Sequence, residues 1–201
     1  YVVTTDIDAG RVAVMVTADG LREGDRVEAT LRPEPAAPGR TGPEAADSLV
    51  ARGSAEPGQP VVLRVEGSRL WSPADPYLYG LELRLLRRDS VLDRVTGHVG
   101  MRKIAVGPDE RGVTRLLLNN RFVFQSGPLD QGYWPDGLYT APTDSAMISD
   151  LLALKAMGFN MLRKHVKVEP RTFYAECDRL GLLVWQDMPS ASIPLASPES
   201  D

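Results

Sequence analysis

The hydrophobic pattern changes its period near the middle of the chain, and this change limits the fold more than any other feature. In residues 1–108 apolar side chains recur at every second position, as in RVAVMVTA, which starts at Arg11. This alternation is typical of strands with one buried face. Short strands separated by turns, without helical periodicity, predict an antiparallel β-sandwich of about 100 residues.

Other segments of this half carry the same alternation. They predict strands at 25–33, 61–67, 81–88 and 91–106. Between Pro33 and Pro60 the chain is rich in proline, glycine and alanine, which predicts a loop with one short strand near Ser48 to Arg52.

Residues 109–201 alternate between strand and helix patterns. Buried strands are expected at 121–127, 159–165 and 182–187. A helix with Thr143 as its N-cap and a second helix from Pro170 to Gly181 separate them. The order strand, helix, strand, helix, strand predicts parallel strands joined by crossover helices, and so an α/β domain.

The α/β half is too short for a complete barrel. A (β/α)8 barrel takes roughly 250 residues, whereas the segment after Gly112 provides about 90 and ends in the loop-like PSASIPLASPESD. We therefore expect the first part of a domain whose remainder is missing. Its unpaired strand edges and apolar side chains, such as those of Leu182 to Trp185, predict that the isolated chain self-associates or leaves its C-terminal half mobile.

Composition excludes several classes of partner. The net charge of −4 gives no reason to expect nucleic acid, whose phosphates favour a basic face. No apolar run reaches the ~18 residues of a membrane span, and Tyr1 does not open a signal peptide. Cys177 is the only cysteine, so an intrachain disulfide is excluded and the compartment stays open. The two histidines are far apart in the sequence, and we expect no metal site.

Four segments, taken in order, resemble family 2 glycoside hydrolases, which include β-galactosidases, β-glucuronidases and β-mannosidases. LWSPADPYLYGLELRL resembles a stretch of the family's immunoglobulin-like domain, and GMRKIAV with LLLNNRFVFQSG its junction with the barrel. LKAMGFNMLRKH resembles barrel strand two, and CDRLGLLVWQDMP the approach to strand three. The resemblance covers about residues 10 to 190.

The resemblance implies a fold and an activity. It implies an immunoglobulin-like sandwich over 1–108 and, over 109–201, the first three βα units of a (β/α)8 TIM barrel. The parent protein would hydrolyse β-glycosidic bonds in carbohydrates with retention of configuration and without a cofactor. This chain would act there in contact with the remaining domains of the parent protein. The family uses an acid/base glutamate in an Asn-Glu pair and a second glutamate as nucleophile. This chain has no Asn-Glu pair, so both are expected beyond residue 201 and the chain alone is expected to be inactive.

The sequence also departs from the family pattern. His165 follows Arg163 by two positions rather than three, and Val166 holds the expected position. Asn120 stands where glycine is usual, and the stretch after strand one, GPLDQGYWPDGLYTAP, is unlike that of the family. The resemblance therefore does not imply which sugar is bound.

Candidate substrate-binding residues follow the predicted barrel strands, because functional residues of such barrels gather at the strands' C-terminal ends. Arg163 would keep a catalytic carboxylate ionised, His165 would donate to a sugar hydroxyl, and Asp187 would accept from one. Aromatic rings and carboxylates after strand one complete the set: Asp130, Tyr133, Trp134 and Asp136.

Each residue also has a structural interpretation. Arg163 can serve as a structural ion-pair partner, His165 as a structural histidine and Asp187 as a cap of the next turn. Tyr133 and Trp134 can pack within their loop. At the level of the whole chain, the alternatives are a non-catalytic carbohydrate-binding or adhesion module, and a small hydrolase that uses Asp187 and Glu169.

Overall fold

The computed structural model describes residues 1–34 and 48–189. The chain divides into two compact units, 1–124 and 125–201. Much of the loop expected between Pro33 and Pro60, and nearly all of the loop expected from residue 189 onward, lie outside the described residues.

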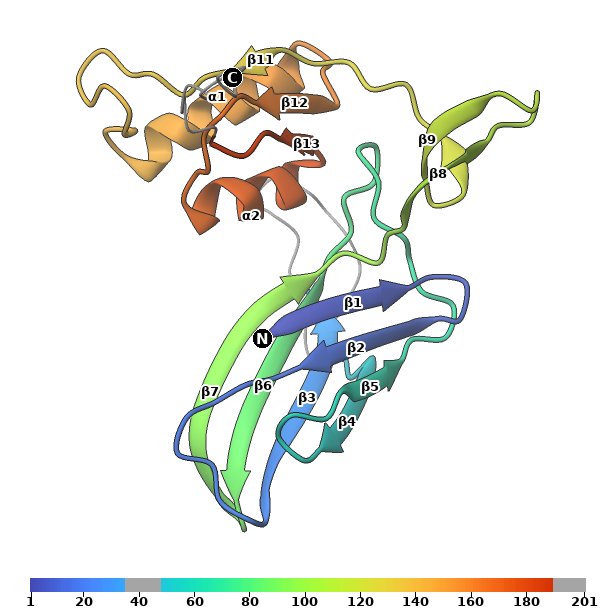
Figure 1. Ribbon diagram of the computed structural model, residues 1–201, viewed down its shortest axis with the longest axis vertical. Coiled ribbons are helices and arrows are strands. Elements are labelled where there is room, and N and C mark those ends of the chain that lie inside the picture. Colours follow the sequence, from blue (N-terminus) through green and yellow to red (C-terminus); the bar gives the residue numbers. More distant parts are fainter. Residues whose placement is uncertain (35–47, 190–201) are drawn as a thin grey trace, which may run out of the picture. The chain divides into compact units, whose positions relative to one another are not determined.

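The first unit is a β-sandwich of two antiparallel sheets (Figure 1). One sheet has the order β1-β2-β5 and the other β4-β3-β6-β7. The strands are β1 (Val2–Asp6), β2 (Arg11–Met15), β3 (Asp25–Pro33), β4 (Ala51–Ala55), β5 (Val61–Arg64), β6 (Tyr79–Arg87) and β7 (Ser90–Val99).

Alternating apolar side chains from both sheets form the core of the sandwich. Val12 and Val14 of β2 are fully buried, and Val61 and Leu63 of β5 lie in the same cluster. The opposite sheet contributes alternate residues of β3 and β6 to this cluster. Burying each such side chain stabilises the fold by roughly 1.5–3 kcal/mol. The predicted β-sandwich is confirmed.

Two strands differ from their predicted bounds. β4 begins at Ala51, later than expected, because its pairing with β3 runs from Leu31–Ala51 to Val27–Ala55. The single strand expected at 91–106 is interrupted after Val99. At Gly100 a Cβ atom would lie 3.2 Å from the Trp71 side chain, so the close approach of this buried ring favours glycine.

A small antiparallel sheet follows, with the order β10-β9-β8. Its strands are β8 (Ile104–Pro108), β9 (Thr114–Leu118) and β10 (Arg121–Phe122). Asn119 and Asn120 form the two-residue turn before β10, with φ of 53° and 65°. Asparagine suits a hairpin turn with two positive φ angles. The compact division follows this sheet, at Phe124, whereas the sequence analysis set the domain limit at residue 108.

The strand expected at 121–127 is not a single element, and that prediction was wrong. The asparagine turn folds Arg121 and Phe122 back onto β9, and the parallel strand that precedes the first helix is β11 (Leu129–Asp130).

The second unit has the predicted order of strands and helices. β12 (Met161–Lys164) pairs in parallel with β11 and with β13 (Leu183–Gln186). Helices α1 (Asp144–Ala156) and α2 (Arg171–Leu180) connect the strands.

Local signals set the limits of both helices. Thr143 Oγ1 accepts from the Ala146 amide at the start of α1, at 3.1 Å. Gly181, with φ of 74°, ends α2. Both limits agree with the sequence analysis.

The helices cover one face of the parallel sheet. Met147 and Leu151 of α1, Phe173 and Cys177 of α2, and Leu162 of β12 belong to one buried cluster. The other face carries Leu129, Arg163 and Trp185 in one register, and all three are about half-exposed. We call this the open face. The eight-stranded barrel stays a prediction, because the described residues contribute three parallel strands.

Candidate functional site

The carboxyl ends of the three parallel strands lie together at one edge of the sheet. Asp130, Lys164 and Gln186 hold the last paired positions of β11, β12 and β13. Side chains of a strand alternate between faces, so residues that follow one another here point in opposite directions. The site therefore has two parts, one on the open face and one on the face that the helices cover.

Arg163 and Asp187 form an ion pair on the open face. Arg163 Nε lies 3.2 and 3.1 Å from the two Asp187 carboxylate oxygens, and a terminal guanidinium nitrogen lies 2.9 Å from Oδ2. The Asp187 amide donates to Lys164 O at 3.0 Å, which extends the ladder past β13. The side chains are 48% and 25% exposed, so the pair contributes only about 0–1 kcal/mol to stability and leaves donors and acceptors open to solvent.

His165 comes just after β12, two positions after Arg163. Its amide donates to Asp130 O at 2.9 Å, and its Nδ1 lies 3.5 Å from Gln131 Nε2. Gln131, which the sequence analysis did not select, can donate to Nδ1 when the imidazole proton is on Nε2.

On the helix face lies a buried group of charges that the sequence analysis did not predict. Lys164 is 1% exposed, and its Nζ lies 2.6 Å from Asp130 Oδ2 and 2.8 Å from Glu169 Oε1. Lys167 is 4% exposed; its Nζ lies 2.8 Å from the same Glu169 oxygen and donates to Gly132 O at 2.9 Å.

Each ammonium also lies over an aromatic ring. Lys164 Nζ is 4.6 Å from the centroid of Phe173, and Lys167 Nζ is 4.6 Å from that of Tyr139. Buried charges are tolerated when they are paired and hydrogen-bonded. In this group two lysines face two carboxylates. The group ties the segment after β11 to the segment after β12.

Asp130, predicted to bind substrate, pairs with Lys164 of this group, although its own side chain is 31% exposed. Its other oxygen, Oδ1, accepts from the Gly132 amide at 2.8 Å. Gly132 has a φ of +66°, and a Cβ there would lie 2.6 Å from Glu169 Oε1 and 2.7 Å from Lys167 Nζ. Only glycine fits this position without moving the charged groups.

Tyr174 and Gln186 connect the buried charges to the end of β13. Tyr174 Oη accepts from the Glu169 amide at 3.1 Å and donates to Gln186 Oε1 at 2.5 Å. Gln186 Nε2 donates to Lys167 O and to Asp187 O, at 2.7 and 2.6 Å. The backbone that carries Asp187 is thus held from the helix side.

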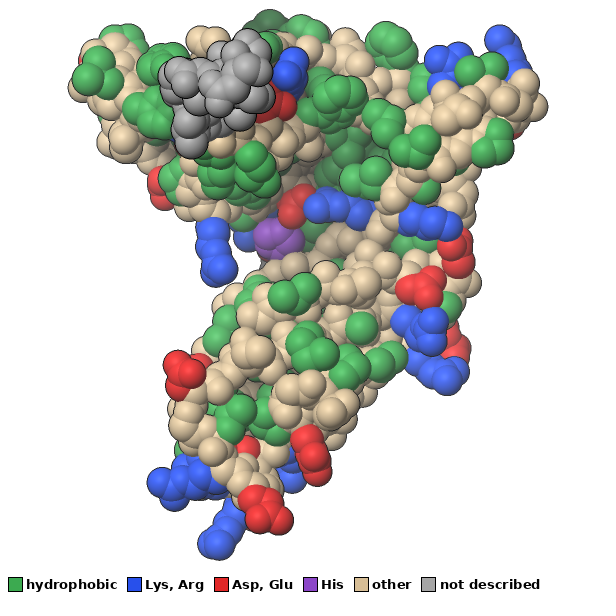
Figure 2. All heavy atoms as spheres, viewed as in Figure 1, with side chains coloured by type: hydrophobic (Ala, Val, Ile, Leu, Met, Phe, Trp, Pro, Cys, Tyr) green, Lys and Arg blue, Asp and Glu red, His purple; other side chains and the backbone are tan. Residues whose placement is uncertain are grey.

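The three other predicted residues lie in the loop between β11 and α1. Trp134 is half-buried and packs against the helix-face cluster. Tyr133 is 68% exposed, and its ring centroid lies 5.5 Å from that of Tyr139. Asp136 is exposed. Tyr133, Leu138 and Tyr139 of this loop are all exposed, and Figure 2 shows hydrophobic side chains, drawn in green, at the surface of the molecule.

The geometry does not support catalysis by Asp187 together with Glu169. Asp187 pairs with Arg163 on the open face, whereas Glu169 is buried between two lysines on the helix face. Cys177 is buried, and its burial raises the pKa of the thiol to about 12, which disfavours the thiolate that a nucleophile requires.

The described residues contain neither a metal-binding cluster nor a membrane-spanning helix. No group of three or more His, Cys, Asp and Glu side chains in this part of the chain could hold a metal ion. Neither α1 nor α2, the helices of the described ranges, has the length and hydropathy that crossing a bilayer requires.

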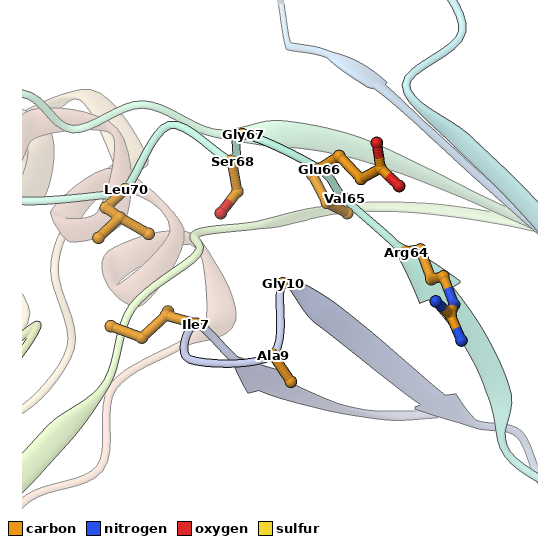
Figure 3. A pocket seen from close by; sticks show the side chains of 9 residues that line it. All are labelled: Ile7, Ala9, Gly10, Arg64, Val65, Glu66, Gly67, Ser68 and Leu70. Atoms are coloured by element: carbon orange, nitrogen blue, oxygen red, sulfur yellow. The ribbon is translucent and has the colours of Figure 1, made fainter.

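A separate pocket of about 400 Å³ lies in the sandwich unit, between the β1–β2 turn and the segment after β5 (Figure 3). Ile7 and Leu70 lie on one side of it, while the side chains of Arg64 and Glu66 point in different directions. Its polar groups do not converge, and none of the predicted site residues lines it.

The sequence matches known proteins over both units. Residues 1–102 match the family model described as glycosyl hydrolases family 2. A β-galactosidase of Lactococcus lactis is 32% identical over 124 residues, which are 61% of this chain and 12% of that protein. A putative β-glucuronidase of Formosa agariphila is 32% identical over 136 residues, 67% of this chain and 12% of that protein.

Solved structures have the same fold over most of the chain. The β-glucuronidase of Ruminococcus gnavus superposes with a TM-score of 0.75 at 21% identity, covering 94% of this chain and 28% of that one. A family 2 member from Bacteroides cellulosilyticus gives a TM-score of 0.70 at 25% identity, covering 90% and 23%. The chain spans about an eighth of the length of the two curated relatives. It belongs to family 2 of the glycosyl hydrolases.

Proposed function

We propose that the chain is part of a retaining glycosidase that cleaves β-linked glycosides. Its first unit would be the immunoglobulin-like sandwich, and its second the first three βα units of the (β/α)8 catalytic barrel. Two observations support this. The relatives are named β-galactosidases and β-glucuronidases, and β11, β12 and β13 are parallel with a helix in each connection.

The observation that carries the proposal is the position of Arg163, His165 and Asp187. They stand at the carboxyl ends of neighbouring parallel strands, beside the open face, where barrel enzymes bind their substrates. Asp187 uses part of its acceptor capacity on Arg163, and its remaining lone pairs can accept from a sugar hydroxyl. His165 can donate from Nε2 while Gln131 occupies Nδ1.

The proposal assigns indirect or flanking roles to the other predicted residues. Asp130 would act through Lys164 and Gly132, which it fixes, rather than by touching the sugar. Tyr133 and Asp136 would contact substrate from the exposed loop, and Trp134 would anchor that loop to the helix face.

The catalytic glutamates would come from another part of the protein. Retaining glycosidases need two carboxyl groups about 5–5.5 Å apart across the scissile bond. At this edge of the sheet Asp130, Glu169 and Asp187 are each paired with a cation, so none of the three is a free carboxyl group. The chain by itself would therefore be inactive.

A hydrolysis assay on nitrophenyl β-glycosides tests the proposal. The 201-residue chain is compared with the native gene product that contains it, over a panel of sugars. We expect cleavage only by the longer protein, and the best substrate then identifies the sugar. Cleavage by the chain alone would place the catalytic carboxylates among its own residues and contradict the assignment. If neither protein cleaves any glycoside, the carbohydrate-binding module becomes the better interpretation.

A further inference from the structure

Two exposed tyrosines lie next to one another in the loop between β11 and α1, drawn in yellow in Figure 1. Tyr133 is 68% exposed and Tyr139 is 45% exposed. Their ring centroids are 5.5 Å apart, and the ring planes are tilted by 56°. We call these two side chains the tyrosine pair.

Backbone pairing brings the two tyrosines together. Trp134 and Leu138 form an isolated antiparallel bridge, with amide-to-carbonyl distances of 2.7 and 2.9 Å in the two directions. Tyr133 and Tyr139 flank this bridge, so they occupy the next opposed positions, where side chains lie on the same face. Trp134 is directed toward the helix-face cluster and anchors the loop.

The buried Lys167 side chain contacts one face of the Tyr139 ring and holds the ring in position. Its Nζ lies 4.6 Å from the centroid of the Tyr139 ring and is held there by Glu169 and by Gly132 O. Tyr139 Oη also donates to Val166 O at 3.3 Å. One face of the Tyr139 ring is thus covered by a cation, and its hydroxyl edge is tied to the segment after β12.

The arrangement favours a ligand with apolar faces. Covering an exposed aromatic ring with an apolar ligand face removes apolar surface from water, which favours binding. The two tyrosines are already held in place before a ligand binds, and this lowers the entropic cost of binding. The charge beneath Tyr139 is already neutralised by Glu169, so the pair does not select an anion. Sugar rings present C–H groups on one face and hydroxyls at the edge, so they can stack on an exposed aromatic ring while their hydroxyls stay hydrated.

We propose that the tyrosine pair is a stacking platform for two successive pyranose rings of a β-linked oligosaccharide, with Lys167 as its positioning residue. This inference rests on the proposed function for the class of ligand. It adds Tyr139 and Lys167 to the site and removes Trp134 from direct contact with sugar.

Calorimetric titration of the 201-residue chain tests the platform. The probes are β-linked oligosaccharides of glucose, galactose, mannose and xylose. We expect at least one to bind, and Tyr133→Ala and Tyr139→Ala each to weaken it by about tenfold. Tyr133→Phe and Tyr139→Phe keep the rings and should keep the affinity within about twofold. Tyr1→Ala, at an exposed tyrosine of the sandwich, is the matched control and should have no effect.

A double-mutant comparison tests the role of Lys167. Lys167→Met should weaken binding when Tyr139 is present and have no further effect in the Tyr139→Ala background, because the lysine acts through that ring. An equal loss of affinity in both backgrounds would show a general structural role and overturn the positioning assignment. Circular dichroism and thermal melting of each variant show whether it is folded.

Different experimental outcomes would contradict the stacking platform and the proposed enzyme activity. If no oligosaccharide binds, or if the alanine variants bind as well as the wild type, the platform is wrong even when the longer gene product hydrolyses glycosides. If the tyrosine variants lose binding while the longer protein cleaves nothing, the platform stands and the enzyme proposal fails.

Discussion

Glu169 Oε1 lies 2.8 Å from Lys164 Nζ, and both side chains are withdrawn from solvent. The same oxygen faces Lys167 at 2.8 Å, so one carboxylate serves two buried ammonium groups. Removing the charge of Glu169 would leave Lys164 paired with Asp130, and Lys167 with the Gly132 carbonyl as its hydrogen-bond partner but without its carboxylate.

Glu169→Gln should therefore be strongly destabilising. We expect a loss of about 3–5 kcal/mol in the free energy of unfolding, since breaking a buried pair leaves uncompensated charge. Denaturant unfolding measures it. Glu176→Gln, which breaks a half-exposed pair with Arg179, is the control and should change stability by less than about 1 kcal/mol. Equal effects of the two substitutions would show that the buried charges contribute no more than surface ones.

Comparing Gly132→Ala with Gly112→Ala distinguishes the destabilisation caused by steric contact from that caused by backbone strain. A Cβ at this position meets Glu169, Lys167 and Lys164 within 3.1 Å. Gly112 also has a positive φ, +76°, but nothing lies within 4 Å of its added Cβ. Both variants should lose about 1 kcal/mol in the free energy of unfolding, because alanine disfavours the left-handed conformation that glycine adopts there. Gly132→Ala should lower the free energy of unfolding by clearly more than Gly112→Ala, as measured by denaturant unfolding. Similar losses in the two variants would mean that the charged side chains around Gly132 move aside without a cost in stability.

The Arg163–Asp187 pair should matter for activity more than for stability. In the longer gene product, Arg163→Ala and Asp187→Ala should each lower kcat/KM on the best nitrophenyl glycoside by at least about a hundredfold. Their melting temperatures should stay near that of the wild type, because the pair is half-exposed. Arg179→Ala, at an arginine on α2, is the control. Near-wild-type kinetics would remove both residues from the site.

Asp25 should make the sandwich sensitive to acid. Hydrogen bonds from Arg87 and from the Arg22 amide lower the pKa of Asp25 to about 2. The unfolded-state pKa is near 3.9, so this stabilisation is complete above about pH 4 and is lost as the pH falls from about 4 to 2.

Asp25→Asn should accordingly flatten the pH dependence of the unfolding free energy over this window. Unfolding followed at a series of pH values measures the slope. Asp19→Asn, at an exposed carboxylate, should leave the slope as it is in the wild type. An unchanged slope in Asp25→Asn would show that the hydrogen bonds to the Asp25 carboxylate do not stabilise the folded state.

The sequence predicted those elements whose signals are local. The alternation around Val12 and Val14 predicted the sandwich, and Thr143 and Gly181 predicted the limits of two helices, because a strand face or a cap depends on a few adjacent residues. β11 was misplaced because Leu129 and Asp130 form a strand only through their pairing with β12, which lies more than thirty residues away.

The buried charges were missed for a related reason. Lys164 follows Leu162 by two positions, so the strand alternation placed it on the buried face, but lysine is ordinarily a surface residue. Its partners Asp130 and Glu169 come from separate loops, and only the folded chain brings them together. Tyr139 was missed likewise, because its neighbours Tyr133 and Lys167 flank it from different segments.

The buried charges also bear on how this part of the molecule moves. Lys164 and Lys167 join the loop after β11 to the loop after β12, so neither loop can detach without exposing unpaired charges that belong to both. Their backbone amides should then exchange with solvent through one shared opening event rather than by independent fraying. The edge of the sheet that carries Arg163 and His165 is, in this sense, a single cooperative unit built from two loops.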